Sequence, residues 1–272
     1  MIYINILYIM NYFIKELTIF DESIIFSDYP NVKKLYIRCN LSYEKLKRIG
    51  SNVKLLVIMD NNFNEELDFL PKNLKELKIV SDKFNKSIRN LPDSINKLEI
   101  KSKIFNKEIK NLPKSLKKLS LYFSKFDKEI KDLPEYLEEL YLCSYELKVI
   151  KLPLRLKKLI IYYCNRYCML ENVPSGLELN INDDNFCMDN IPEGVNKLYI
   201  ENVNFNEELN NLPLGLIELD IKSVKFNKRL YNLPLSLKCV KIQEYYKRIY
   251  SIEEIKNMLP LGCDLYIDNK RI

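Results

Sequence analysis

The sequence predicts an α/β-type repeat solenoid dominated by β structure, in which short parallel strands stack into a curve and the returns between them are mostly non-helical. Three observations predict it. All eleven prolines occupy one position of an internal repeat, successive prolines are mostly 21 residues apart, and an apolar triplet follows each proline. About 12 repeats of about 21 residues fill the 272-residue chain, and such short units bury their apolar side chains only by stacking.

The predicted strand of each repeat carries apolar residues three, six and eight positions after the proline. The last two alternate as the inward-facing residues of a strand do. In the copies at Pro30, Pro174 and Pro260 these two arrive one place early, which indicates a shortened turn before an intact strand. The clearest triplets are Leu74/Leu77/Ile79, Ile95/Leu98/Ile100, Leu116/Leu119/Leu121, Leu137/Leu140/Leu142, Leu156/Leu159/Ile161, Val195/Leu198/Ile200, Leu216/Leu219/Ile221 and Leu237/Val240/Ile242.

The predicted return begins with a phenylalanine, usually eight residues before the proline and usually followed by asparagine. Two residues after the proline stands glycine, asparagine or serine in most copies, which predicts a tight turn before the strand. The phenylalanine pairs are Phe63-Asn64, Phe84-Asn85, Phe105-Asn106, Phe126-Asp127, Phe205-Asn206 and Phe226-Asn227, with Phe186-Cys187 as a shortened version.

The repeat runs through nearly the whole chain, so the sequence predicts a single continuous domain. Residues 1–29 are expected to form an N-terminal capping copy, residues 30–242 the repeats, and residues 243–272 a C-terminal capping copy. Residues 1–14 are mostly apolar but lack a positive leading region and a small-residue cleavage site, so a cap is expected there rather than a signal peptide. In the last copy, Ser251 and Glu254 predict a capping box for a helix that ends at Leu259.

Composition disfavours several functions. The chain has 43 Lys and Arg against 37 Asp and Glu, a balance that does not by itself imply nucleic-acid binding. Histidine is absent, which removes the usual general base and a common metal ligand. We therefore expect no catalytic site, no cofactor and no metal.

The seven cysteines are expected to be free thiols in an intracellular, cytoplasmic protein. Cys164 and Cys168 form a CxxxC pair that leaves a metal or redox site as the alternative. No histidine and no second pair at zinc-like spacing supports that alternative.

The consensus F-N-[KE]-x-[IL]-x-x-L-P-x-x-L-x-x-L-x-I resembles the FNIP repeat, a variant of the leucine-rich repeat, best over residues 63–142 and 205–242. The resemblance implies a leucine-rich-repeat-like solenoid from a large AT-rich DNA virus or an amoeba. It also implies that residues such as Lys103 occupy a position where leucine-rich repeats carry a ladder asparagine. We expect the asparagine after each phenylalanine to bond the backbone of the turns instead.

The exposed strand face is expected to bind a partner. Aromatic and aliphatic residues gather there on nearby predicted strands, rimmed by lysines, which is the composition of a protein-binding hot spot. The alternative is that tyrosine, with 19 copies, is simply common here and favoured in strands. The predicted partner-binding residues are Tyr122, Tyr141, Ile160, Tyr162, Tyr199, Lys118, Lys158 and Lys197.

The favoured function is thus a non-catalytic protein interaction module, with a host protein as the expected partner and self-association through a solenoid end as a further expectation. Two alternatives stay open. One is a substrate-recognition subunit of a ubiquitin ligase assembled in trans, which the family resemblance suggests. The other is nucleic-acid binding, because lysines interleave with tyrosines, although Glu138-Glu139 interrupts the basic stripe. No membrane span is expected.

Overall fold

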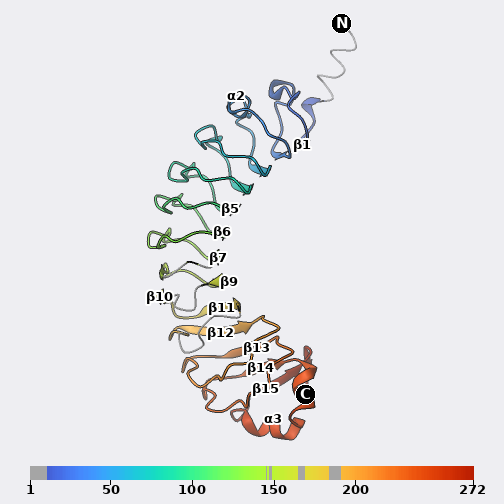
Figure 1. The fold of residues 1–272 in the computed structure, drawn as a ribbon, viewed down its shortest axis with the longest axis vertical. Helices are drawn as coiled ribbons and strands as arrows, with labels where there is room; N and C mark the ends of the chain where they lie inside the picture. Colours follow the sequence, from blue (N-terminus) through green and yellow to red (C-terminus); the bar gives the residue numbers. More distant parts are fainter. Residues whose placement is uncertain (1–10, 145, 147–148, 165–168, 184–190) are drawn as a thin grey trace. The chain divides into compact units, whose positions relative to one another are not determined.

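The computed structural model describes residues 11–144, 146, 149–164, 169–183 and 191–272. The chain forms two compact units, Met1–Leu137 and Glu138–Ile272, each a β-dominated repeat solenoid of parallel strands joined by long returns (Figure 1). The predicted fold class is therefore confirmed.

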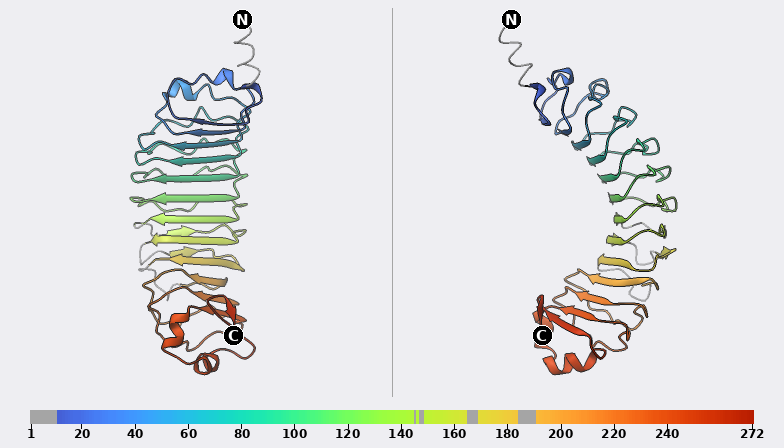
Figure 2. Two further views of the ribbon diagram at one scale, coloured as in Figure 1. Left: turned by 90° about the vertical axis from the view of Figure 1, so that its right-hand side faces the viewer. Right: turned by 180° about the vertical axis from the view of Figure 1, so that it is seen from behind.

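The first unit contains a parallel sheet whose strands follow chain order (Figure 2). Successive strands pair with the apolar triplet residues in register, including those of the shortened copy, where Leu35 lies between Leu17 and Leu56. A 3-10 helix (η1, Phe26–Asp28) and a helical turn (α2, Tyr43–Leu46) lie in two of its returns. The strands are β1 (Glu16–Ile19), β2 (Lys34–Ile37), β3 (Leu55–Met59), β4 (Glu76–Val80), β5 (Lys97–Ser102) and β6 (Lys118–Phe123).

The second unit continues the same architecture in its own strands. A two-stranded sheet of β8 (Val149–Lys151) and β10 (Met169–Glu171) lies in its returns, where the sequence analysis expected no strand. The main strands are β7 (Glu139–Ser144), β9 (Lys158–Cys164), β11 (Leu177–Asn182), β12 (Val195–Ile200), β13 (Glu218–Ile221), β14 (Cys239–Ile242) and β15 (Asp264–Ile267).

The core is formed by the predicted apolar anchors. Every residue of the eight clearest triplets is buried. Behind them the phenylalanines stack in a ladder, with ring centroids 5.8 Å apart for Phe63 and Phe84 and 6.0 Å apart for Phe84 and Phe105. In the second unit Phe205 and Phe226 repeat this stacking at 5.6 Å. Each repeat thus buries its side chains against its neighbours.

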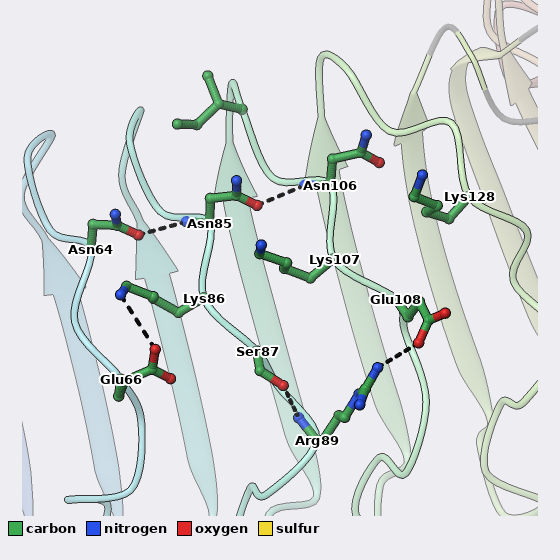
Figure 3. A pocket seen from close by; sticks show the side chains of 11 residues that line it. Asn64, Glu66, Asn85, Lys86, Ser87, Arg89, Asn106, Lys107, Glu108 and Lys128 are labelled. Atoms are coloured by element: carbon green, nitrogen blue, oxygen red, sulfur yellow. Dashed lines mark hydrogen bonds and ion pairs between the residues drawn. The ribbon is translucent and has the colours of Figure 1, made fainter.

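The asparagines after the phenylalanines form the expected polar ladder. The side-chain oxygen of Asn64 accepts from the backbone N–H of Asn85 at 2.9 Å, and that of Asn85 accepts from Asn106 at 3.0 Å (Figure 3). Asn206 does the same for Asn227 at 2.9 Å. The hypothesis that these asparagines bond the backbone of stacked returns is confirmed.

A second polar ladder was not predicted. The buried hydroxyls of Ser81, Ser102 and Ser223 each donate to the carbonyl of the preceding repeat's phenylalanine at 2.8 Å. Each hydroxyl also accepts a backbone N–H two residues further on, at 3.3 Å. These serines satisfy backbone groups that would otherwise be buried without partners.

The C-terminal copy has the predicted helix and final strand. Helix α3 (Ile252–Met258) begins with the Ser251/Glu254 capping box and buries Ile255. A short 3-10 helix, η3 (Glu244–Arg248), precedes it. Strand β15 is followed by β16 (Lys270–Arg271), which pairs with it in antiparallel fashion and was not predicted. Asp268 and Asn269 adopt left-handed backbone angles of 46° and 65°, as a two-residue hairpin turn requires.

Three glycines lie two residues after a proline in left-handed turns. Gly176, Gly194 and Gly262 have φ angles of 85°, 102° and 79°. Residues with a Cβ adopt that region rarely, so glycine is favoured in these turns. Turn length does not determine this, because Gly194 lies in a copy of ordinary length and the shortened copy at Pro30 has Val32 at the same position.

Candidate functional site

The predicted binding residues of the second unit gather on the open face of its sheet, the face opposite the core. Tyr141 of β7 lies beside Ile160 of β9, and Asn180 of β11 lies between Ile160 and Tyr199 of β12. Tyr162 stands beside this column, aligned with Cys143. We call Tyr141, Ile160, Tyr162 and Tyr199 the tyrosine cluster.

Two of the predicted residues, Tyr122 and Lys118, belong to the first unit. Both lie on β6, where Tyr122 aligns with Lys101 of β5. Tyr122 helps to line a hollow of about 350 Å³ together with Met59 and Val80. The predicted set is thus divided between the two units, and six of its eight members lie in the second.

The tyrosine cluster is ordered before any partner arrives. Its tyrosines are half-buried, and Ile160 is only 7% exposed. The hydroxyl of Tyr141 donates to Glu139 at 3.0 Å. Burial raises the pKa of Tyr162 and of Tyr199, and for Tyr199 the carboxylate of Glu218 adds to the effect. These phenols therefore stay protonated at neutral pH and present apolar rings with fixed polar ends.

Two of the lysines expected at the rim, Lys158 and Lys197, are paired with carboxylates of neighbouring strands. Lys158 lies 2.5 Å from Glu178, and this hydrogen bond raises the pKa of the Lys158 ammonium. Lys197 lies 3.7 Å from Glu218, which also binds Lys241 at 2.5 Å. The surroundings of the cluster are consequently of mixed charge rather than cationic.

A fourth ion pair lies at the opposite edge of the open face, just beyond the ends of β12 and β13. Lys222 binds Glu201 at 2.6 Å. The Lys222 hydrogen bond, with a further one from Asn180, holds the pKa of Glu201 below its ordinary value. Four lysines and three glutamates therefore form ordered pairs beside the cluster.

Two polar residues on the open face were missed as site residues. Asn180 is buried, and its side-chain oxygen has no hydrogen-bond partner among the described residues. Asp220 is 6% exposed, and burial raises the pKa of its carboxyl group. The sequence places both residues in the central column of the strand face, but it does not show that they are buried.

The open face of the first unit carries an apolar hollow that the sequence analysis did not single out. Tyr36, Leu55, Val57 and Met59 line a volume of about 330 Å³, bounded on one side by the ion pair of Lys78 with Glu99 at 2.7 Å. The signal was available in the sequence, because residues 55–59 are apolar at every position instead of alternating.

The returns of the first unit form a polar groove of about 620 Å³ (Figure 3). The asparagine ladder runs along it, and Lys86 binds Glu66 at 3.3 Å while Arg89 binds Glu108 at 2.5 Å. Four basic residues (Lys86, Arg89, Lys107 and Lys128) and two acidic residues (Glu66 and Glu108) line the groove, so the ion pairs offset only part of its positive charge.

The cysteines give no support for a metal site. Cys168 and Cys187 lie outside the described residues, so the CxxxC pair is not seen as a whole. Across the part of the chain that the structure describes, no group of three or more His, Cys, Asp or Glu side chains is arranged to hold a metal ion. Burial raises the pKa of the thiol of Cys263 to about 11, which keeps it protonated.

Comparisons with known proteins bear on the fold. The FNIP Repeat family model matches residues 63–103. The crystal structure of CroV588, described as a novel circular LRR protein, resembles 93% of this chain with a TM-score of 0.55 and 20% identity. This chain spans only 42% of the CroV588 structure, and at that identity the likeness shows the fold alone.

Two further comparisons add little. The crystal structure of the pneumococcal vaccine antigen PcpA aligns over 88% of this chain and 78% of its own, with 18% identity and a TM-score of 0.24 that supports no inference. No curated protein matches the sequence. Among the described residues, no helix combines the length and apolar character needed to cross a membrane.

Proposed function

We propose that this chain, which carries the FNIP repeat in a leucine-rich-repeat-like solenoid fold, is a non-catalytic module that binds another protein on the open face of its second unit. Stacked repeats suit this role, because they create an extended surface of exposed side chains on a rigid core.

The observation that carries the proposal is the alignment of the tyrosine cluster across neighbouring strands. Tyr141, Ile160 and Tyr199 occupy one column of the sheet, with only Asn180 between the last two. Tyrosine is enriched at protein interfaces because it combines a large apolar ring with a polar end and has few rotamers to lose.

Ordering of the surface strengthens this assignment. The strands fix the backbone, and the bond of Tyr141 to Glu139 fixes one side chain. A preordered surface loses little side-chain entropy on binding, which leaves more of the contact energy as affinity. The ion pairs beside the cluster supply a polar rim that discriminates between partners by charge.

The proposal is tested by partner capture with purified protein. The resemblance to repeats of large DNA viruses and amoebae makes host-cell lysate the first source to try. The wild-type protein is compared with a Tyr141→Ala/Tyr162→Ala/Tyr199→Ala variant. Alanine is preferable to a charged residue here, because Tyr199 already faces Glu218.

A matched control removes tyrosines elsewhere in the chain. Tyr231→Ala/Tyr245→Ala deletes two rings that are 53% and 46% exposed and lie outside the cluster. We expect a partner that binds the wild type and the control but not the cluster variant, with all three proteins melting at similar temperatures. Equal capture by all three would contradict the proposed site.

A further inference from the structure

A row of exposed leucines runs along one rim of the second unit. Leu214, Leu235 and Leu261 each follow a proline directly and are 78%, 92% and 106% exposed. They lie in turns of three consecutive repeats. The hydroxyl of Ser236 lies 2.7 Å from the carbonyl oxygen of Leu214, and the N–H of Asp264 donates to Lys238, so these turns stack on one another. We call these three residues the leucine row.

The fold does not require leucine at this position. In the first unit the residue after the proline is polar, as in Lys72, Asp93 and Lys114. The turn is the same in both units, since Leu116 N–H donates to Pro113 and Leu216 N–H donates to Pro213, each at 3.1 Å. Three aligned, almost fully accessible leucines form an apolar patch of the kind that marks an interaction site.

Open space lies directly beside the row. The residues after Leu214, Leu235 and Leu261 are Gly215, Ser236 and Gly262. A Cβ added at Gly215 or Gly262 would meet no atom within 4 Å. A partner segment can therefore approach the backbone closely along the flank of the row.

We propose that the leucine row docks an amphipathic helix of a partner protein, lying along the stacking direction with its apolar face on the leucines. The spacing favours a helix. Paired strands lie ~4.8 Å apart, and the rings of Phe205 and Phe226 in two successive returns lie 5.6 Å apart, so successive repeats are spaced by about 5 Å. Along a helix, apolar residues at alternating three- and four-residue intervals are ~5.3 Å apart. Along an extended peptide, side chains on the same side are ~6.7 Å apart. The helical spacing is therefore closer to the spacing of the repeats.

Size and charge distinguish the helix from other occupants. Three leucines present far less than the ~800 Å² per partner of a standard protein interface, which disfavours a second copy of this chain. At one end of the row, the carboxylate of Glu193 accepts from the N–H of Leu214 at 3.2 Å. A carboxylate there repels anionic lipid but attracts a lysine or arginine that flanks the apolar face of a helix.

The test is fluorescence anisotropy with a labelled synthetic peptide of about 18 residues. It carries leucine at heptad positions a and d, flanking lysines, and glutamine elsewhere. A second peptide of the same composition has leucine at every second position. It has an apolar side only when it is extended, so it controls for binding of a strand. The protein variant Leu214→Lys/Leu235→Asp/Leu261→Lys introduces residue types that the first unit carries in the same turn.

The matched control is Leu154→Lys. Leu154 also follows a proline and is 74% exposed, but its repeat is not adjacent to the row. We expect the heptad peptide to bind the wild type and Leu154→Lys at least about tenfold more tightly than it binds the triple variant. We also expect the wild type to bind the heptad peptide more tightly than the alternating peptide.

Each other outcome overturns the proposal. If the wild type and the triple variant bind the heptad peptide equally, or if neither binds it, the leucine row is not a binding site for a helix. Pelleting of the wild type, but not the triple variant, with phosphatidylcholine/phosphatidylserine vesicles would identify a membrane as the occupant. A dimer in sedimentation velocity that the triple variant loses would identify a second copy.

Discussion

Single polar side chains determine how well the returns of this solenoid stack. Each ladder asparagine accepts a backbone N–H from the next return, so one residue type satisfies one otherwise unpaired group in each repeat. A loop stacked on its own copies has no strand partner for that N–H. The asparagine supplies the missing acceptor.

Asn106→Ala tests this role directly. The change removes the oxygen that accepts the N–H of Asp127 at 3.4 Å. A net loss of about 1 kcal/mol in the free energy of unfolding is expected for one such hydrogen bond. Urea unfolding of the variant measures it, with Lys107→Ala as the control on the neighbouring exposed residue. If Asn106→Ala is as stable as the control, the hydrogen bonds of the asparagine ladder do not contribute measurably to stability.

Asp220 makes the opposite contribution, because its carboxylate is buried in the folded protein. Burial raises its pKa, so the folded state binds a proton more readily than the unfolded state and stability falls as pH rises through this range. We expect Asp220→Asn to be more stable than the wild type at pH 7. The difference should shrink as the pH falls towards 3.8, the ordinary pKa of the group.

Thermal unfolding from pH 3 to pH 7 measures this difference. Asp93→Asn, in an exposed turn of the first unit, controls for the loss of one carboxylate. A variant that is less stable than the wild type at pH 7 would mean that Lys222 and Lys241 stabilise the Asp220 carboxylate more than burial destabilises it.

At the scale of elements, helix α3 closes the C-terminal copy through its N-cap. The Ser251 hydroxyl accepts the N–H of Glu254 at 3.2 Å, and the Glu254 carboxylate accepts the N–H of Ser251 at 2.8 Å. Ser251→Ala should lower the free energy of unfolding by about 1 kcal/mol. Ser251→Thr keeps the hydroxyl and should restore most of the loss. Urea unfolding of both variants measures these effects. If Ser251→Ala is as stable as the wild type, the Ser251 hydroxyl does not stabilise the start of the helix.

Elements with a strong local pattern were predictable from the sequence, and those without one were not. The triplet alternation located the strands, and the spacing of Ser251 and Glu254 located α3. Strand β16 is only two residues long. Strands β8 and β10 are three residues long and pair through Ile150 and Leu170, although Leu170 occupies the same repeat position as Ile88 and Ile109, where no strand forms. Pairing of such short segments depends on where the fold places them, which one sequence does not reveal.

The candidate site was predictable in part for the same reason. The register of the sheet follows from the repeat, so the column of Tyr141, Ile160 and Tyr199 could be derived in advance. The pairing of Lys158 with Glu178 and the burial of Asn180 could not, because both depend on side-chain directions between strands.

At the scale of the whole molecule, a repeat solenoid transmits a defect mainly to adjacent repeats, since its contacts are between neighbours. Phe105 stacks on Phe84 and Phe126, with centroids 6.0 and 6.3 Å away. Phe105→Ala should therefore destabilise the first unit by about 3–5 kcal/mol. Amide hydrogen exchange should show loss of protection in β5 and β6 and little change in β13 and β14.

Phe20→Ala is the matched control, because the Phe20 side chain is 71% exposed and lies outside the phenylalanine ladder. Equal loss of protection in β13 and β14 would show that the two units unfold as one cooperative system. The nearest-neighbour description would then be wrong for this protein.

Protein binding on the open face of the second unit is tested most directly by hydroxyl-radical footprinting of the protein alone and with its captured partner. We expect oxidation of Tyr141, Tyr162 and Tyr199 to fall in the complex, while oxidation of the exposed Tyr231 and Tyr245 stays unchanged. Unchanged oxidation of the three cluster tyrosines, with protection appearing elsewhere, would contradict binding on this face.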